Sequence, residues 1–329
     1  MCIFAQEFFL KNTNHHRDIL KQRLSGKSKD FFAVVGPCSI YEEEETFLYE
    51  EKLKNLQGEL GDSIFLFMRA FVEKSRTSLG WRGFVYQPDL LKPEDILKGI
   101  DRTRKLFLQL QTPLAMECID PNIYPYLEDL LCWGFIGART STSTTHRVLA
   151  SNGSIPFGFK NTLDGDISSA INSCIVSKHS HCILTENGQT FTKGNPYTHL
   201  VLRGGYNGPN YSRNELEKAS SAAKNQGIST PILIDCSHGN SPNKPDDQKT
   251  AFLSAIERFN ESKENILGVM LESNLHKGSD KRIKRHGVSF TDPCLSFDET
   301  RELLLIAAEK ITQQRKEESN QPTSYAYNH

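Results

Sequence analysis

The sequence lacks the features of a membrane-anchored or secreted protein. No apolar stretch approaches the ~20 residues that a membrane-spanning helix needs. The N-terminus, MCIFAQEFFLKNTNHH, carries Gln6 and Glu7 among its apolar residues and has no basic start, so it does not resemble a secretory signal. We therefore expect residence in the cytoplasm and no contact with a membrane.

The sequence also has little net charge and no paired cysteine motif. A net charge of −1 gives no electrostatic reason to expect a nucleic-acid partner. The eight cysteines are scattered and form no CxxC pair, which is typical of a protein from a reducing compartment. Most of them are expected to be small buried side chains, and any positive potential has to be local.

An alternation of short apolar segments and helix-length polar segments begins at residue 31. The apolar segments are rich in Val, Ile and Phe, which is typical of strands buried on both faces of a parallel sheet. We predict strands at 31–38, 63–71, 113–119, 133–139, 156–160, 198–203, 231–238 and 266–272. We predict helices at 42–58, 94–110, 122–131, 142–150, 165–177, 212–226, 246–260 and 298–314.

This alternation predicts an α/β fold with a single (β/α)8 TIM barrel over residues 31–312. A short N-terminal extension (1–30), helical around 18–24, precedes the barrel, and the C-terminal tail 313–329 is predicted to be disordered. Two smaller α/β domains are the alternative, although no linker rich in Pro, Gly or Ser divides the chain. Three stretches fit neither helix nor strand and are predicted to be long loops: 73–89, 182–197 and 273–297.

Charged or metal-binding side chains end nearly every predicted strand. In a (β/α)8 barrel the C-terminal ends of the strands form one rim, and active sites lie there. We therefore expect eight side chains to converge at one mouth: Cys38, Arg69, Glu117, Arg139, Lys160, Arg203, His238 and Glu272.

Cations dominate this predicted mouth, although the net charge of the protein is near zero. Packed together they would repel one another unless anions bind, and Arg is well suited to phosphate and carboxylate groups. A set of substrates with more than one phosphate is implied. The six cations are Arg69, Lys74, Arg76, Arg139, Lys160 and Arg203.

A second group at the mouth combines a thiol, an imidazole and two carboxylates: Cys38, His238, Glu272 and Asp292. Each of these residue types, taken alone, more often has a structural role, as an inert buried Cys or a paired Glu. Their expected meeting instead indicates a site for a divalent ion such as Mn, Fe, Co or Zn.

Eight longer motifs follow one another along the chain, and together they resemble the signatures of the type I synthases of 3-deoxy-D-arabino-heptulosonate 7-phosphate (DAHP). The resemblance covers residues 31 to about 312. The motifs are GPCSI at 36–40, MRAFVEKSRTSLGWRG at 68–83, GFIGARTSTSTTHR at 134–147, GFKNTLDG at 158–165, HLVLRGGYNGPNY at 199–211, IDCSHGNS at 234–241, GVMLES at 268–273 and FTDPC at 290–294.

The resemblance implies a metal-dependent barrel that condenses phosphoenolpyruvate with erythrose 4-phosphate and releases phosphate, the first step of the shikimate pathway to the aromatic amino acids. By motif position, the metal would be held by Cys38, His238, Glu272 and Asp292. The phosphate of phosphoenolpyruvate would be bound by Arg139, Lys160 and Arg203, and its carboxylate by Arg69 and Lys160.

The same resemblance assigns the remaining residues of the site. Arg76 and Thr77 would bind the phosphate of erythrose 4-phosphate, and Glu117 would line the phosphoenolpyruvate pocket. We predict catalytic roles for His238 and for Lys74, which would lie between the reacting centres and transfer a proton. The family usually has Pro where Ser75 stands, a departure that replaces no ligand and no phosphate contact.

Three other functions compete with this prediction. One is a 3-deoxy-octulosonate 8-phosphate synthase, which shares the barrel but differs from the KSRT motif at 74–77. Another is a non-catalytic regulatory paralogue of the barrel. The third is an aldolase that forms a Schiff base on Lys160. The resemblance further implies a homo-oligomer, either a dimer or a tetramer.

Overall fold

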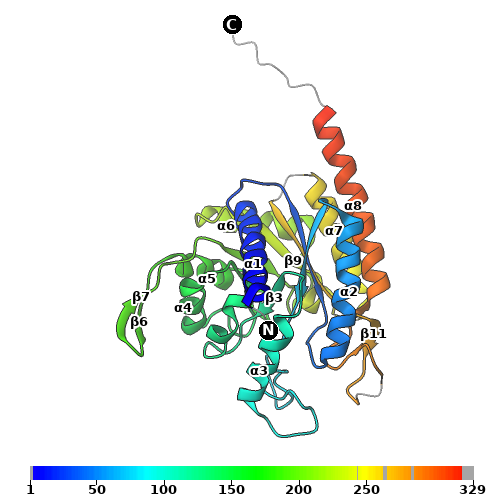
Figure 1. Cartoon of the computed structure of the whole chain (residues 1–329). Helices are drawn as coiled ribbons and strands as arrows, with labels where there is room; N and C mark the ends of the chain where they lie inside the picture. Colours follow the sequence, from blue (N-terminus) through cyan, green and yellow to red (C-terminus); the bar gives the residue numbers. More distant parts are fainter. Residues whose placement is uncertain (1–2, 243, 262–264, 283–284, 321–329) are drawn as a thin grey trace.

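Eight parallel strands form a closed sheet in the computed structural model, which describes residues 3–242, 244–261, 265–282 and 285–320 (Figure 1). They are β1 (Phe31–Gly36), β2 (Ile64–Arg69), β3 (Leu114–Glu117), β4 (Trp133–Ile136), β5 (Phe157–Lys160), β8 (Thr198–Leu202), β9 (Ile232–Asp235) and β10 (Ile266–Asn274). They pair in this order, and a pairing between β10 and β1 closes the sheet. The predicted (β/α)8 barrel is therefore confirmed.

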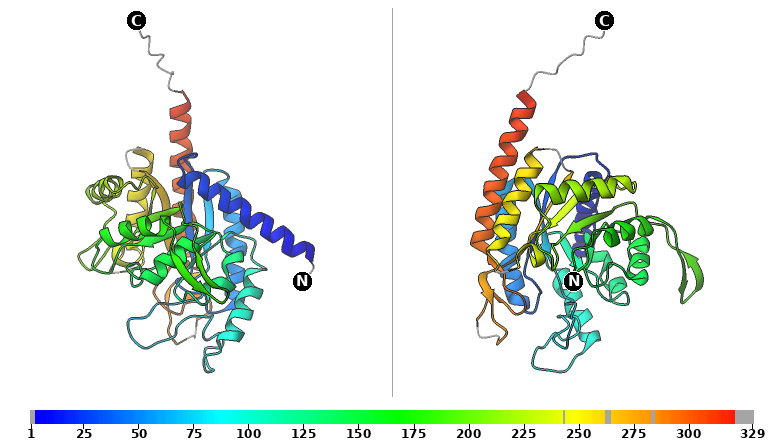
Figure 2. Two further views of the ribbon diagram at one scale, coloured as in Figure 1. Left: turned by 90° about the vertical axis from the view of Figure 1, so that its left-hand side faces the viewer. Right: turned by 180° about the vertical axis from the view of Figure 1, so that it is seen from behind.

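Helices cover the outside of this barrel (Figures 1 and 2). They are α2 (Glu43–Leu60), α3 (Ile96–Phe107), α4 (Thr144–Asn152), α5 (Ser168–Lys178), α6 (Arg213–Asn225), α7 (Asp247–Glu261) and α8 (Phe297–Asn320). The alternation along each strand explains the continuous apolar segments of the sequence. In β1, for example, Phe32 and Val34 pack inside the barrel, whereas Ala33 and Val35 belong to the layer between strands and helices.

Helix α1 (Ile3–Leu24) is longer than the predicted segment and closes the N-terminal end of the barrel. Its Leu20 and Leu24 are buried in the same cluster as the interior side chains of the strands. Arg17 donates a hydrogen bond of 2.6 Å to the carbonyl of Glu128, and Arg23 donates one of 2.7 Å to the carbonyl of Ile266. This helix leaves the opposite, C-terminal end of the barrel free for a site.

The predicted helix at 122–131 is wrong. The structure has two single 3-10 turns there, η1 (Tyr124–Tyr126) and η2 (Glu128–Leu130). Pro125 has no N–H to donate within a helix. Arg17 of α1 donates hydrogen bonds to the carbonyls of Glu128 and Leu131, and the carbonyl of Glu128 also accepts one from the N–H of Leu131 in a single 3-10 turn.

The predicted loop at 182–197 contains a β-hairpin that extends from the barrel (Figure 1). Strands β6 (Cys182–Thr185) and β7 (Gly188–Phe191) pair antiparallel, with Thr185 opposite Gly188. An Asn-Gly dipeptide at the turn is a strong hairpin signal that outweighs the polar composition of this stretch. The predicted loop at 273–297 contains the short strands β11 (His276–Ser279), β12 (Val288–Ser289) and β13 (Leu295–Ser296).

The prediction of a disordered tail is wrong for residues 313–320, because α8 continues to Asn320. Side-chain pairs four residues apart, such as Gln313 with Glu317, support the last turns. Arg315 donates a hydrogen bond of 3.0 Å to the carbonyl of Asp62, which ties the helix to the barrel. The rest of the predicted tail, 321–329, lies outside the described residues.

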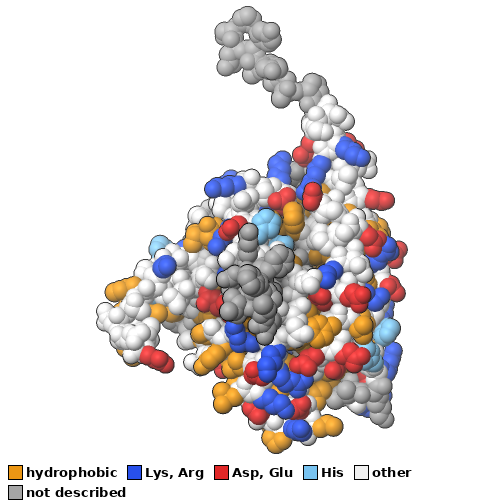
Figure 3. Space-filling view, viewed as in Figure 1, with side chains coloured by type: hydrophobic (Ala, Val, Ile, Leu, Met, Phe, Trp, Pro, Cys, Tyr) orange, Lys and Arg blue, Asp and Glu red, His pale blue; other side chains and the backbone are white. Residues whose placement is uncertain are grey.

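On the face shown in Figure 3, basic and acidic side chains are interspersed. Within the described ranges, no helix combines the length and the apolar character that crossing a bilayer requires.

Candidate active site

All of the predicted site residues line one cavity of about 260 Å³ at the C-terminal end of the barrel. Arg69, Glu117 and Lys160 are the last residues of β2, β3 and β5, and Glu272 lies near the end of β10. The closed parallel sheet brings these distant parts of the chain to one rim. The expected convergence of the strand ends is therefore present in the fold.

Three of the four predicted metal ligands lie close together. Single ligand atoms of Cys38, Glu272 and Asp292 all lie within 4.8 Å of one another, and we call these three residues the metal-type cluster. His238 borders this group, because its Nε2 is 3.7 Å from Oε1 of Glu272. Its backbone has a φ of 60°, the one positive φ outside glycine among the described residues. Such a conformation is uncommon and is often found at functional sites.

Lys74 lies between two of these ligand atoms. Its Nζ is 2.8 Å from Sγ of Cys38 and 2.7 Å from Oδ2 of Asp292. Burial opposes the charge on Lys74, but the acidic groups around it, Cys38, Glu272 and Asp292, raise its pKa above the usual value. Burial likewise opposes the charge on Asp292, yet Lys74 holds the pKa of that carboxyl well below its usual value. The ammonium of Lys74 therefore supplies a positive charge between these ligand atoms.

The thiol of Cys38 behaves differently from its neighbours. Burial, followed by the nearby Glu272 carboxylate, raises the pKa of Cys38 to about 11 in spite of Lys74. The thiol accordingly donates a hydrogen bond of 3.3 Å to Oδ2 of Asp292. A thiolate at neutral pH would require a stronger positive charge than one ammonium.

A buried carboxylate that the sequence analysis missed, Asp235, connects the two halves of the site. Its Oδ2 lies 2.9 Å from Nζ of Lys160 and 3.0 Å from Nδ1 of His238. Ser237 Oγ also donates a hydrogen bond of 2.5 Å to its Oδ1. Burial opposes the charge, but Lys160 and His238 hold the pKa of Asp235 well below its usual value. Asp235 thus fixes both the ammonium and the imidazole.

Arg69 is held in the floor of the cavity with only 1% of its surface exposed. Its Nη2 lies 3.1 Å from Oε1 of Glu272, so it also touches the metal-type cluster. The guanidinium stacks 4.0 Å from the ring centre of Phe71, a cation–π contact. The positive charge of Arg69 is therefore held in the cavity between Glu272 and the Phe71 ring.

The loop after β2 joins the two predicted phosphate sites. Arg139 donates hydrogen bonds of 2.8 Å to Oγ1 of Thr77 and 3.3 Å to Oγ of Ser75. Arg76 is held from within the loop by a bond of 2.7 Å from its Nε to the carbonyl of Trp81. The cations of the two predicted phosphate sites therefore share one wall of the cavity.

The cavity also contains Glu73 and Phe71, which the sequence analysis did not select. Burial raises the pKa of Glu73 to about 8, although the backbone N–H groups of Ile119 and Asp120 donate to its carboxylate.

Of the residues that the sequence analysis missed, Asp235 has a sequence signal, because it ends an apolar strand as the selected residues do. Nothing in the spacing of Phe71 distinguishes it from a core side chain.

The fold and the cavity define a class of protein, a (β/α)8 barrel with a polar site for anionic substrates beside a candidate metal centre. The model of the DAHP synthetase I family matches residues 8–304. The chain therefore belongs to the DAHP synthetase I family. Members of this family are generally metal-dependent, and the Cys38, Glu272 and Asp292 cluster offers one set of ligands.

Two curated relatives and one solved structure are similar to most of the chain. The Tyr-sensitive phospho-2-dehydro-3-deoxyheptonate aldolase of Escherichia coli is 37% identical over 301 residues, which are 88% of this chain and 84% of the relative. The phenylalanine-inhibited aldolase of Saccharomyces cerevisiae is 34% identical over 318 residues, 91% of this chain and 86% of the relative. The phospho-2-dehydro-3-deoxyheptonate aldolase structure from Francisella tularensis aligns with a TM-score of 0.89 at 35% identity and covers 93% of both chains.

Proposed function

We propose that this protein condenses phosphoenolpyruvate with erythrose 4-phosphate to give DAHP and inorganic phosphate, the first step of the shikimate pathway. The observation that carries the proposal is the single cavity in which anion-binding side chains meet a metal-type cluster. Family membership supports the same reaction. In this reaction C3 of phosphoenolpyruvate attacks the aldehyde carbon, water adds at C2, and phosphate leaves.

The cations of the cavity bind and orient the two substrates. Lys160, Arg139 and Arg203 hold the phosphate of phosphoenolpyruvate, and Arg69, together with Lys160, holds its carboxylate. Arg76 and Thr77 hold the phosphate of erythrose 4-phosphate, and Glu117 lines the pocket beside Lys160, 3.7 Å away. Fixing both anions in one cavity aligns the reacting carbons and lowers the entropic part of the barrier.

The metal-type cluster fits a divalent ion of the Mn, Fe, Co or Zn type. Its donors combine one thiol with two carboxylates, and an ammonium already lies 2.8 Å and 2.7 Å from two of them. We assign Cys38, His238, Glu272 and Asp292 as the ligands. A bound divalent ion would supply a Lewis acid that polarises the aldehyde.

Lys74 is our candidate for the proton donor. It lies in the cavity beside the ligand set and is held in its charged form by the surrounding negative groups. An ammonium here can give a proton to the new alkoxide oxygen as the carbon–carbon bond forms. His238 is held by Asp235 at Nδ1, which leaves Nε2 directed at the cluster.

Turnover with two sugar phosphates tests this function. We expect phosphate release from phosphoenolpyruvate with erythrose 4-phosphate, loss of activity with a chelator, and recovery with Mn²⁺. The Cys38→Ala variant should lose the Mn²⁺ response, whereas Cys182→Ala, in the exposed part of the hairpin, should keep it. Turnover with arabinose 5-phosphate alone, or no turnover with either sugar, would contradict the proposal.

A Schiff-base mechanism is disfavoured by the surroundings of Lys160. Its ammonium is paired with Asp235 at 2.9 Å, so it is not a free amine. Borohydride in the presence of both substrates should therefore trap no covalent adduct.

The proposal also includes assembly as a homodimer or homotetramer, which light scattering after size-exclusion chromatography would test. It further includes residence in the cytoplasm, which cell fractionation would test.

A further inference from the structure

Glu73 is a buried acidic residue in the wall of the candidate active site, directly before Lys74 in the chain. Only 1% of its surface is exposed. Its Oε1 accepts a hydrogen bond of 3.1 Å from the backbone N–H of Ile119, and its Oε2 accepts one of 2.9 Å from that of Asp120. Each oxygen keeps a lone pair for such a bond whether the carboxyl group is charged or protonated. Glu73 therefore ties the loop after β2 to the segment after β3.

The segment after β3 is a firm anchor for this loop. The N–H of Cys118 donates a hydrogen bond of 2.8 Å to the carbonyl of Phe135 in β4, so the pairing with the sheet continues up to the residue before Ile119. The carbonyl of Ile119 accepts a hydrogen bond of 2.7 Å from Nε2 of His146 in α4. Glu73 consequently joins the loop to a part of the barrel that other elements hold in place.

The loop that Glu73 holds carries three side chains of the proposed site: Lys74, Arg76 and Thr77. The backbone N–H of Lys74 donates a hydrogen bond of 2.8 Å to the carbonyl of Arg82, within the same loop. This bond fixes Lys74 relative to the rest of the loop but not relative to the barrel. The two bonds to the carboxyl group of Glu73 connect this part of the backbone to the barrel.

We propose that Glu73 is a positioning residue of the active site, which fixes the backbone at Lys74 against the segment after β3 and so holds the Lys74 ammonium in place. In the proposed function, on which this inference rests, Lys74 gives a proton to the new alkoxide oxygen. A misplacement of about 1 Å at a reacting group can cost about a hundredfold in rate. Removal of the Glu73 carboxyl group should therefore lower kcat although Lys74 is still present.

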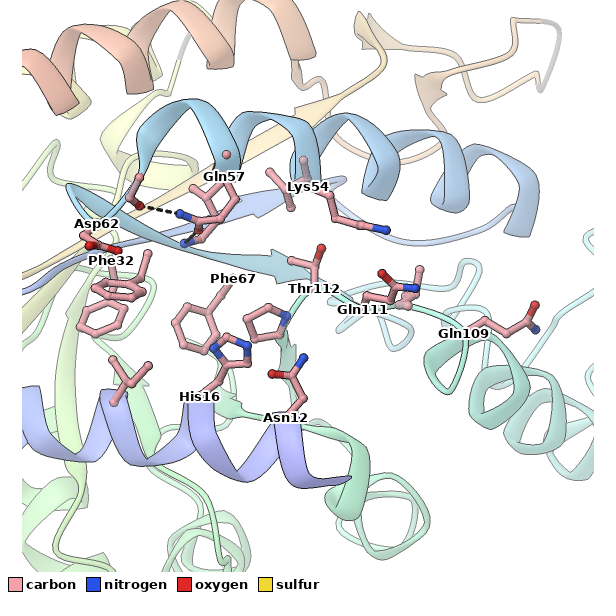
Figure 4. Close-up of a pocket in the computed structure, with 18 of the residues that line it drawn as sticks. Asn12, His16, Phe32, Lys54, Gln57, Asp62, Phe67, Gln109, Gln111 and Thr112 are labelled. Atoms are coloured by element: carbon pink, nitrogen blue, oxygen red, sulfur yellow. Dashed lines mark hydrogen bonds between the residues drawn. The ribbon is translucent and has the colours of Figure 1, made fainter. Parts of the chain in front are cut away.

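The other end of β3 offers a matched control. Glu50 of α2 is also buried, and its Oε1 accepts hydrogen bonds of 3.0 Å and 3.1 Å from the backbone N–H groups of Gln111 and Thr112, just before β3. Gln111 and Thr112 line a separate cavity, of about 800 Å³, at the opposite end of the barrel from the candidate active site (Figure 4). Glu50 therefore makes the same kind of contact at the end of the barrel away from the proposed reaction.

Phosphate release by the full chain with phosphoenolpyruvate, erythrose 4-phosphate and Mn²⁺ compares Glu73→Ala with Glu50→Ala. Each substitution removes a buried carboxyl group that accepts two backbone N–H bonds, so both should lower the thermal midpoint of unfolding. We expect kcat to fall about ten- to hundredfold in Glu73→Ala and less than about twofold in Glu50→Ala. The KM for phosphoenolpyruvate should stay within about twofold in both variants, because the cations assigned to its phosphate lie outside this loop.

Two results of this comparison would count against the proposals in different ways. An equal fall of kcat in both variants, or no fall in Glu73→Ala, overturns the positioning role alone. Absence of phosphate release by the wild type overturns the proposed function, and the positioning role with it.

A double-mutant cycle with Lys74→Ala separates positioning from a general loss of structure. Adding Glu73→Ala to Lys74→Ala should lower kcat by less than about twofold further, because the side chain that Glu73 positions is gone. A further loss as large as that in the wild-type background would overturn the proposal.

A conservative variant provides a rescue. Glu73→Gln keeps one acceptor oxygen, so its kcat should lie about three- to tenfold below that of the wild type, above that of Glu73→Ala. If Glu73→Ala does not fold, Glu73→Gln decides alone, and a wild-type kcat in this variant refutes the positioning role.

Discussion

The Asp235→Asn substitution tests the network that connects the two halves of the candidate active site. Asparagine has nearly the same shape and can still accept the hydrogen bond that Ser237 donates to Oδ1. It removes the negative charge 2.9 Å from Lys160 and 3.0 Å from His238. Lys160 then remains buried, with Glu117 at 3.7 Å as its nearest carboxylate.

The size of the effect follows from burial. Asp235 is 0% exposed and Lys160 is 2% exposed, so solvent cannot replace the lost partner. Removing one member of a buried ion pair costs about 3–5 kcal/mol. A surface carboxylate provides the control: Asp246→Asn removes a partner of Lys249 and Lys277 in an exposed cluster, and we expect a loss below about 1 kcal/mol.

Urea denaturation of the wild type and both variants measures these losses. The folded-state pKa of Asp235 is depressed, so its contribution is present above the unfolded-state pKa of about 3.9 and is lost only as pH falls further. The deficit of Asp235→Asn should therefore be present at both pH 7 and pH 5.5. A deficit below about 1 kcal/mol, or one equal to that of Asp246→Asn, would refute the assigned role of Asp235.

Three further predictions concern other parts of the molecule. Lys74→Ala should lower kcat by about 10²–10⁴-fold, while Mn²⁺ binding measured by calorimetry persists; surviving turnover would exclude Lys74 as the proton donor. Gly83→Ala should lower the urea-derived unfolding free energy by more than about 2 kcal/mol, since Gly83 has a φ of 117° and a Cβ there would lie 2.3 Å from the carbonyl oxygen of Val72; Gly58→Ala, with open space around it, is the control. Burial lowers the pKa of His16 to about 4 in the folded protein, so on acidification the unfolded chain takes up a proton at this residue first. The urea-derived unfolding free energy should therefore fall by about 1–2 kcal/mol between pH 6.5 and pH 4.5, after discounting for partial exposure. The same loss in His16→Leu would contradict this.

The strands and the rim could be predicted from the sequence because each depends on local information. A strand buried on both faces leaves a continuous apolar segment, and a barrel places whatever ends it at one mouth. Cys38, Lys160 and Glu272 were therefore predictable as neighbours, although more than a hundred residues separate each from the next. The motifs extended this prediction to Asp292, which no strand end marks.

The errors arose where tertiary contacts override composition. Residues 313–320 are polar and look disordered, but α8 continues through them, Arg315 donates a hydrogen bond to the carbonyl of Asp62, and Glu318 pairs with Lys29. The segment 122–131 is long enough for a helix, but Arg17, which lies in α1, donates hydrogen bonds to two of its carbonyl groups. Neither contact leaves a pattern in the segment itself, because the partner lies elsewhere in the chain.

The missed Asp235 shows why a site is harder to predict than a fold. The sequence indicated which side chains carry charge to the rim, but not which of them neutralise one another. In the structure, Lys160 is paired with Asp235, Arg69 with Glu272, and Lys74 with Asp292. The cations and the metal-type ligands, which we predicted as two separate groups, therefore form one network. Since each carboxylate of the ligand set is shared with a cation, binding of a divalent ion and binding of an anionic substrate should be mutually dependent.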